Sequence, residues 1–119
     1  MNSGPDPLQE LTERLRAFAA ERDWEQFHSP KNLASALTVE TAELLEHFQW
    51  LSEAESANLS DAQRQAVALE MADVLLYLLR LADRLGVDLP AAARAKLELN
   101  ARKYPVDKSR GRSTKYTEL

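Results

Sequence analysis

The sequence predicts an all-α protein, and three observations lead to this fold class. Only 3 of the 119 residues are glycine and 5 are proline, whereas alanine and leucine are abundant. Apolar residues recur at helical spacing through most of the chain. Serine or aspartate followed by proline marks several helix starts. The length fits one domain, and an apolar fraction of 45% is sufficient for a core.

A first helix is predicted from Pro7 to about Arg22, after a short lead at residues 1–6 that we expect to be disordered. Its apolar residues share one helical face. These residues are Leu8, Leu11, Leu15 and Phe18. The segment 22–28 is rich in aromatic side chains and is predicted to be a loop.

The second helix is predicted to begin at Ser29 and Pro30 and to reach about Trp50. Ser29 has the chemistry of an N-cap, and proline is favoured at the first helical position because its missing N–H has no helical partner there. The polar segment 52–58 is predicted to hold about one helical turn.

Ser60 is predicted to cap a third helix that stops at Gly86, and Asp88 to cap a fourth that runs to about Arg102. From Pro105 onward the chain is basic and poor in apolar residues. We therefore expect a four-helix domain over residues 7–104. We expect residues 105–119 to be a basic tail that is mobile unless a ligand or a partner subunit orders it.

Two of these helices place a carboxylate inside the apolar stripe. At about 100° per residue, Leu33 and Leu51 lie about 20° from Glu40 around the helix axis. Tyr77 lies about 20° from Glu70 in the same way. A buried carboxylate costs several kcal/mol unless it is neutralised or paired. These two positions therefore need a specific explanation.

The carboxylates occur as matching pairs, Glu40 with Glu43 and Glu70 with Asp73. Neither lysine nor arginine lies three or four positions from Glu40, Glu70 or Asp73, so the helices supply no counter-charge of their own. A hard divalent ion, Mg²⁺ or Mn²⁺, suits four oxygen ligands. A lysine or arginine from another segment or subunit is the structural alternative.

A di-iron site is disfavoured by the histidine spacing. Such bundles use Glu-x-x-His on two helices, whereas His47 follows Glu43 by four positions and the third helix has no histidine.

Cysteine is absent, which excludes disulfides and thiolate metal sites. The net charge of −4 argues against a nucleic-acid-coating protein, even with the basic tail. No segment resembles a membrane span or signal peptide, so a cytoplasmic protein is expected.

The order of the acidic pairs resembles the signature of the MazG-like all-α nucleotide pyrophosphohydrolases. Other stretches extend the resemblance to the dCTP pyrophosphatase branch over nearly the whole chain. They are FAAERDWEQFH at 18–28, FQW at 48–50, DVLLY at 73–77, VDLP at 87–90 and KYTEL at 115–119.

The resemblance implies an enzyme that hydrolyses a nucleoside triphosphate between the α- and β-phosphates, for cleaning of the nucleotide pool. It implies Mg²⁺ held by the four acidic residues Glu40, Glu43, Glu70 and Asp73. Residue chemistry leaves a second role open, in which one of these carboxylates, or Glu46 one turn further on, orients the attacking water instead. The resemblance also implies a dimer, or a tetramer that pairs two dimers. A thin bundle of this length is itself expected to complete its core with a second copy.

Further site residues follow from the same resemblance and from residue chemistry. Trp24, Trp50 and Tyr77 are expected to line a nucleotide pocket, where base stacking is worth about 1–3 kcal/mol. A second set is assigned to phosphate or sugar contacts. That set is Lys96 and Asn100, with Tyr104 close behind them in the sequence and with weaker support for Arg102 and Lys103. Lys31 is added to it because it follows the helix N-cap at Ser29.

One position departs from the resemblance. The dCTP-preferring relatives hold the base with a histidine nine residues before the loop tryptophan, and this chain has Leu15 there. Leucine cannot hydrogen-bond a base edge. We therefore expect dCTP or a 5-modified dCTP as a substrate within a broader range. A dUTP-directed or broad pyrophosphatase and a non-catalytic nucleotide- or Mg²⁺-binding module are the alternatives.

Overall fold

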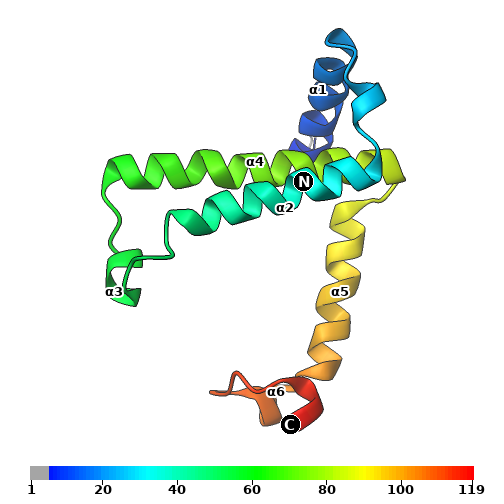
Figure 1. The fold of residues 1–119 in the computed structure, drawn as a ribbon. Helices are drawn as coiled ribbons and strands as arrows, with labels where there is room; N and C mark the ends of the chain where they lie inside the picture. The colour runs from blue at the N-terminus through cyan, green and yellow to red at the C-terminus, as the bar shows by residue number, and fades with distance from the viewer. Residues whose placement is uncertain (1–5) are drawn as a thin grey trace. The chain divides into compact units, whose positions relative to one another are not determined.

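The computed structural model describes residues 6–119, all of which lie in helices, turns or loops (Figure 1). The all-α prediction is confirmed. Six α-helices and two 3₁₀ turns follow one another along the chain. They are α1 (Pro7–Glu21), η1 (Glu25–Phe27), α2 (Pro30–Glu46), α3 (Glu53–Ser56), α4 (Asp61–Leu85), α5 (Leu89–Lys103), α6 (Val106–Ser109) and η2 (Tyr116–Glu118). None of these helices has the length and apolar character needed to cross a bilayer.

The helix starts are set by side-chain caps. Ser29 accepts a hydrogen bond from the Asn32 N–H, and Asp88 accepts one from the Ala91 N–H. Ser60 forms a reciprocal capping box with Gln63. These bonds satisfy backbone donors that have no partner inside the first helical turn. The caps predicted at Ser29, Ser60 and Asp88 are therefore confirmed, and Gly86 ends α4 in the left-handed conformation at φ 68°.

The predicted end of the second helix was wrong. α2 ends at Glu46, and residues 47–50 form a turn. The N–H groups of His47 and Phe48 bond to carbonyls three residues back, at 3.3 and 2.8 Å. This tighter 3₁₀-type pattern satisfies the terminal carbonyls and stops the α-helix before Trp50. Apolar periodicity alone did not reveal the change.

The chain forms two compact units, one up to Gly86 and one over residues 87–119. The predicted domain boundary after residue 104 stays a prediction. Residues 1–5 of the predicted lead lie outside the described part. Asp6 accepts a hydrogen bond from the Leu8 N–H and caps α1.

In the first unit, α2 and α4 lie side by side and antiparallel, and α1 packs on α4 (Figure 1). Contacts at the two ends fix the direction. Arg80 reaches His28 at 3.2 Å, whereas His47 lies 3.8 Å from Glu70. The buried apolar residues come from all three helices and make a small core. They are Ala19, Leu33, Val67, Leu79 and Ala82.

The second unit contains α5 and the C-terminal segment. The Tyr104 and Tyr116 rings meet edge-to-face with centroids 5.9 Å apart. The Lys103 ammonium lies 4.7 Å from the centroid of Tyr116. Aromatic and cation–π contacts of this kind each contribute on the order of 0.5–1 kcal/mol. They hold the last residues of the chain against the end of α5.

Candidate active site

Three carboxylates converge between α2 and α4. Glu40 and Glu43 lie one turn apart on α2, and Glu70 lies opposite them on α4. Each offers one oxygen such that the three atoms lie within 4.8 Å of one another. All three residues are half-buried. The antiparallel register of the two helices therefore brings together acids that are far apart in the sequence.

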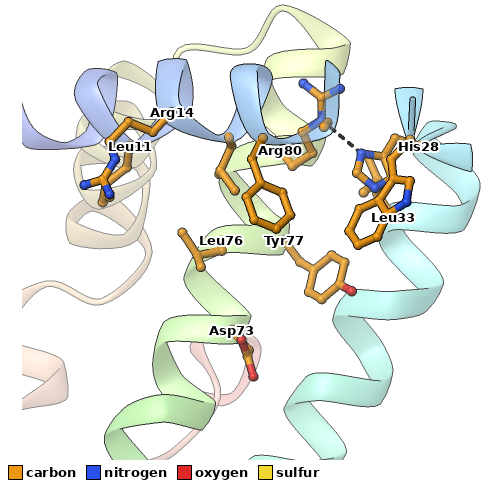
Figure 2. A pocket seen from close by; sticks show the side chains of 12 residues that line it. Leu11, Arg14, His28, Leu33, Asp73, Leu76, Tyr77 and Arg80 are labelled. Carbon is orange, nitrogen blue, oxygen red and sulfur yellow. Dashed lines mark hydrogen bonds between the residues drawn. The ribbon is translucent and has the colours of Figure 1, made fainter. Parts of the chain in front are cut away.

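Asp73 lies one turn beyond Glu70 on α4 and is more exposed than the other three acids. It is absent from the tight trio but lies on the wall of the neighbouring cavity (Figure 2). Its charge is close enough to act on Glu40. Asp73 thus connects the acidic cluster with the cavity.

The acidic cluster is not neutralised from within the first unit. Glu40 Oε2 and Glu70 Oε2 are buried and accept no hydrogen bond. Within residues 6–86, no lysine or arginine forms an ion pair with any of the four acids. The one basic contact in this range comes from His47, whose Nε2 lies 3.8 Å from Glu70 Oε1. Buried lone pairs of this kind are costly unless a cation or donor reaches them.

The electrostatic cost is visible at Glu40. The pKa of Glu40 is raised to about 7, chiefly by burial and then by the adjacent Glu43 carboxylate, with smaller contributions from Asp73 and Glu70. Like charges at short range disfavour ionisation of both groups. A cation at the cluster would reverse this effect.

The donor chemistry fits a hard divalent cation. The cluster offers carboxylate oxygens only, and two of these oxygens lack any partner. Mg²⁺ and Mn²⁺ prefer such ligands, whereas softer metals prefer sulfur or imidazole. Glu40, Glu43 and Glu70 would hold the ion, and Asp73 would be the additional carboxylate at the cavity side.

A cavity of about 430 Å³ lies beside the acidic cluster, between α1, α2 and α4 (Figure 2). Its volume falls in the range of small-molecule sites. Much of the wall is aliphatic or aromatic, which suits a flat organic ring. The apolar wall residues are Leu11, Leu15, Phe18, Leu33 and Leu76. Trp24 and Tyr77 complete the aromatic part of the wall.

Of the three aromatic residues predicted for a nucleotide pocket, Trp24 and Tyr77 line this cavity and Trp50 does not. Trp50 follows the end of α2 and is 87% exposed. Leu15 also lines the cavity. The residue that stands in place of the relatives' histidine therefore faces the same space as the aromatic side chains.

The residues predicted for phosphate contacts lie in two places. Lys31 is exposed in the first turn of α2. Lys96 and Asn100 lie one turn apart on α5, exposed and half-buried respectively, and Tyr104 ends that helix. The α5 residues belong to the second unit, and all four roles stay predictions.

The C-terminal two thirds of the chain, residues 36–119, match the family model described as "MazG-like family". The chain belongs to the MazG-like family. The matched region includes both acidic pairs.

Curated relatives support the family assignment. The proteins named dCTP pyrophosphatase 1 from Rattus norvegicus and Homo sapiens are 51% and 50% identical over 118 residues. Each alignment covers 97% of this chain and 69% of the relative. A crystal structure of a pyrophosphatase from Archaeoglobus fulgidus superposes with a TM-score of 0.81 at 40% identity. That superposition covers 88% of this chain and 98% of the other.

This MazG-like chain also contains a buried polar network that sequence patterns did not identify. Arg80 is only 4% exposed and donates from Nε to His28 Nδ1 at 3.2 Å. Its Nη1 donates to Asp83 at 3.3 Å, and Arg16 from α1 forms two bonds to the same carboxylate at 2.7 and 2.9 Å. A signal was available, because Arg80 and Asp83 have salt-bridge spacing inside an apolar stretch.

The network lowers the pKa of both Asp83 and His28, which favours the charged carboxylate and the neutral imidazole. The hydrogen bonds from Arg16 hold the pKa of Asp83 below its ordinary value, with Arg80 and Arg84 adding to the effect. Burial lowers the pKa of His28, and the positive charges of Arg80 and Arg84 lower it further. His28 is therefore neutral near pH 7.

Proposed function

We propose that this chain is a Mg²⁺-dependent nucleoside triphosphate pyrophosphohydrolase that releases a nucleoside monophosphate and pyrophosphate. The observation that carries the proposal is the trio of carboxylates with unpartnered oxygens, placed beside a cavity of nucleobase size. The relatives named dCTP pyrophosphatase 1 support dCTP or a modified dCTP as a substrate.

Each part of the site has a role in this reaction. Glu40, Glu43, Glu70 and Asp73 are proposed to hold the ion. A bound Mg²⁺ supplies charge neutralisation to the phosphates and makes water more acidic. A carboxylate of this cluster, or the exposed Glu46 one turn further along α2, orients the attacking water and accepts its proton.

The cavity is proposed to take the base. Trp24 and Tyr77 offer aromatic faces for stacking on the base. The exposed Trp50, which does not line the cavity, is proposed as a further contact with the nucleotide. Because Leu15 has no hydrogen-bonding group, cytosine selectivity is expected to be weaker than strict, and activity extends to other deoxynucleotides. Lys96, Asn100, Tyr104 and Lys31 are proposed to contact the phosphates or the sugar.

We also propose that the chain acts as a homo-oligomer, a dimer or a tetramer built from two dimers. The buried core is small, while several large apolar side chains are exposed. Exposed apolar surface of this extent is typical of protein interfaces. Leu45 and Leu69 are examples, at 59% and 71% exposure. A cytoplasmic role in cleaning the nucleotide pool accords with this activity.

The test is incubation of the purified protein with Mg²⁺ and a panel of dCTP, 5-methyl-dCTP, dUTP, dTTP, dATP, dGTP and CTP, with products resolved by chromatography. Monophosphate and pyrophosphate are expected, and Glu40→Gln should abolish both. Absence of turnover on every nucleotide would refute the enzyme and leave a nucleotide- or Mg²⁺-binding module. Comparable rates on all four deoxynucleotides would refute only the preference for cytosine.

A further inference from the structure

We propose that Arg80 is a positioning residue that fixes the aromatic loop, residues 22–28, as a wall of the cavity. The proposal rests on the proposed function of the cavity as a nucleotide site. In this role Arg80 does not touch the substrate, and it acts on binding through the loop that carries Trp24. Figure 2 shows Arg80 beside His28 at one end of the cavity, with Asp73 toward the other.

Two arginines of α4 hold the end of the loop. Arg80 Nε donates to His28 Nδ1 at 3.2 Å, and Arg84 Nε donates to the His28 carbonyl at 3.1 Å. The first bond fixes the ring and the second fixes the backbone. The His28 and Trp24 rings lie edge-to-face with centroids 6.3 Å apart, and Phe18 of α1 meets Trp24 in the same way at 5.7 Å. Trp24 is therefore held between α1 and a ring that Arg80 orients.

Arg80 is itself held from the side of α1. Its Nη1 donates to Asp83 at 3.3 Å, and Arg16 of α1 forms two bonds to the same carboxylate, at 2.7 and 2.9 Å. Paired bonds between a guanidinium and a carboxylate have a defined planar geometry. Asp83 therefore fixes Arg80 relative to α1 as well as α4. The contacts join α1, α4 and the loop, which are three of the elements that line the cavity.

The burial of Arg80 argues for a role beyond packing. The residue is only 4% exposed, and its Nη2 is buried without a hydrogen-bond partner. A buried charge with an unsatisfied donor is costly, and an apolar side chain of similar volume is often as good or better for stability. An apolar side chain cannot, however, bond to His28 and Asp83 at once. Holding the loop is therefore what the guanidinium adds at this position.

A positioning role predicts which kinetic constant changes. The loop wall would contact the base of every nucleotide, whereas the acidic trio, Glu40, Glu43 and Glu70, does not line the cavity. A loosened wall should therefore weaken the binding of all bases alike and leave the chemical step and the Mg²⁺ site unchanged. A residue that read the base directly would instead change the selectivity between bases.

The substitution Arg80→Met separates positioning from stability. Methionine keeps an apolar stem but bonds to neither His28 nor Asp83, and Asp83 still has its two bonds from Arg16. We expect the KM for dCTP and for dATP to rise alike, about tenfold, with little change in kcat. The Tm should be unchanged or higher, because a buried charge is removed while its partner stays paired.

Two further variants complete the comparison. Arg80→Lys should not restore the KM, because a single ammonium lacks the fork of donors that reaches two partners at once. Arg64→Met is the matched control on the same helix. The Arg64 side chain is 72% exposed and lies 4.0 Å from Asp61, so its loss should leave both KM and Tm unchanged.

A second measurement does not depend on catalysis. The chain has two tryptophans, so in a Trp50→Phe background the tryptophan emission comes from Trp24 alone. We expect Arg80→Met to increase the quenching of Trp24 by acrylamide about twofold without any nucleotide, because the loop opens more often. Arg64→Met should not change it.

Three outcomes would overturn the proposal. A fall in the Tm of Arg80→Met, or its failure to fold, would assign Arg80 to stability alone. A KM that rises for one base only would make Arg80 a direct contact with the base. An unchanged KM or unchanged quenching of Trp24 would show that Arg80 does not hold the loop. Lack of turnover by wild type would refute the proposed enzyme, and the quenching of Trp24 would then decide whether Arg80 fixes the wall.

Discussion

Glu40 of α2 and Glu70 of α4 bring carboxylate oxygens within 4.8 Å of each other, and each also has a buried oxygen without a hydrogen-bond partner. The two residues occupy positions that periodicity assigns to the packing stripe of their helices. Charges of the same sign at this separation oppose association of the helices. The unliganded site is therefore a source of instability that a bound cation removes.

The pH dependence of metal-free stability should reveal this cost. The pKa of Glu40 is raised to about 7 in the folded chain, above its value of 4.5 in the unfolded chain. A raised carboxylate pKa means that the folded state binds the proton more tightly. This contribution is complete below about pH 4.5 and is lost as the pH rises through about 7. We expect Glu40→Gln to be more stable than wild type at about pH 8 without metal.

The measurement is thermal unfolding of wild type and Glu40→Gln at a series of pH values, with a chelator present to remove divalent metal. The difference between their Tm values isolates Glu40 from other titrating groups. Glu53→Gln is a matched control, because Glu53 lies in the first turn of α3, away from the cluster. A constant difference from pH 5 to about pH 8 would contradict the prediction.

Divalent cations should stabilise the protein through the same residues. A ligand that binds only the folded state adds about 2.7 kcal/mol to the free energy of unfolding at a hundred times its Kd. We expect Mg²⁺ to raise the Tm of wild type, and Glu70→Gln to lose most of this shift. Equal Mg²⁺-dependent shifts in wild type, Glu70→Gln and the Glu53→Gln control would place the ion elsewhere.

Helix identity and helix starts could be predicted from the sequence because they depend on local chemistry. Ser29, Ser60 and Asp88 each cap a helix through their own side chain, and Gly86 ends one through its own backbone conformation. The end of α2 depends instead on a change of hydrogen-bond pattern at His47. No single residue type signals that change.

The acidic pairs could be predicted as a candidate site because a carboxylate in an apolar stripe is conspicuous in one helix alone. The Arg80–His28 contact joins α4 to a loop distant in sequence, so only the antiparallel packing of α2 and α4 reveals it. The same holds for Leu15, whose place on the cavity wall depends on how α1 crosses α4. Tertiary contacts of this kind leave no local pattern.

Exposure of Trp50 leads to a prediction about folding and substrate binding. The side chain is 87% exposed in the isolated chain, so Trp50→Ala removes little buried surface and should change the free energy of unfolding of a single chain by less than about 0.5 kcal/mol. A contact of Trp50 with the nucleotide would instead appear as a raised KM of Trp50→Ala.

Trp24→Ala is the comparison variant. The Trp24 and Phe18 rings pack edge-to-face with centroids 5.7 Å apart, so this substitution should lower stability and also raise the KM. An unchanged KM for Trp50→Ala would remove that residue from the substrate site.

The shared carboxylate of Asp83 should be important for stability. Asp83→Asn leaves the buried Arg80 without its anionic partner and weakens two bonds from Arg16. Breaking a buried ion pair costs about 3–5 kcal/mol, but Arg16 is about half exposed, so we expect a loss of about 2 kcal/mol. Glu10→Gln is the surface control, because it disrupts an exposed pair with Arg14 at 4.0 Å and should cost less than about 1 kcal/mol.

The pH dependence of this variant should run opposite to that of Glu40→Gln. The pKa of Asp83 is held below its ordinary value, so its stabilisation is present above the unfolded pKa of 3.8 and is lost as the pH falls below it. Chemical denaturation of wild type and Asp83→Asn should therefore give free energies that differ near pH 7 and converge in acid. A difference that persists unchanged to about pH 2 would assign the effect to packing rather than to the charge of Asp83.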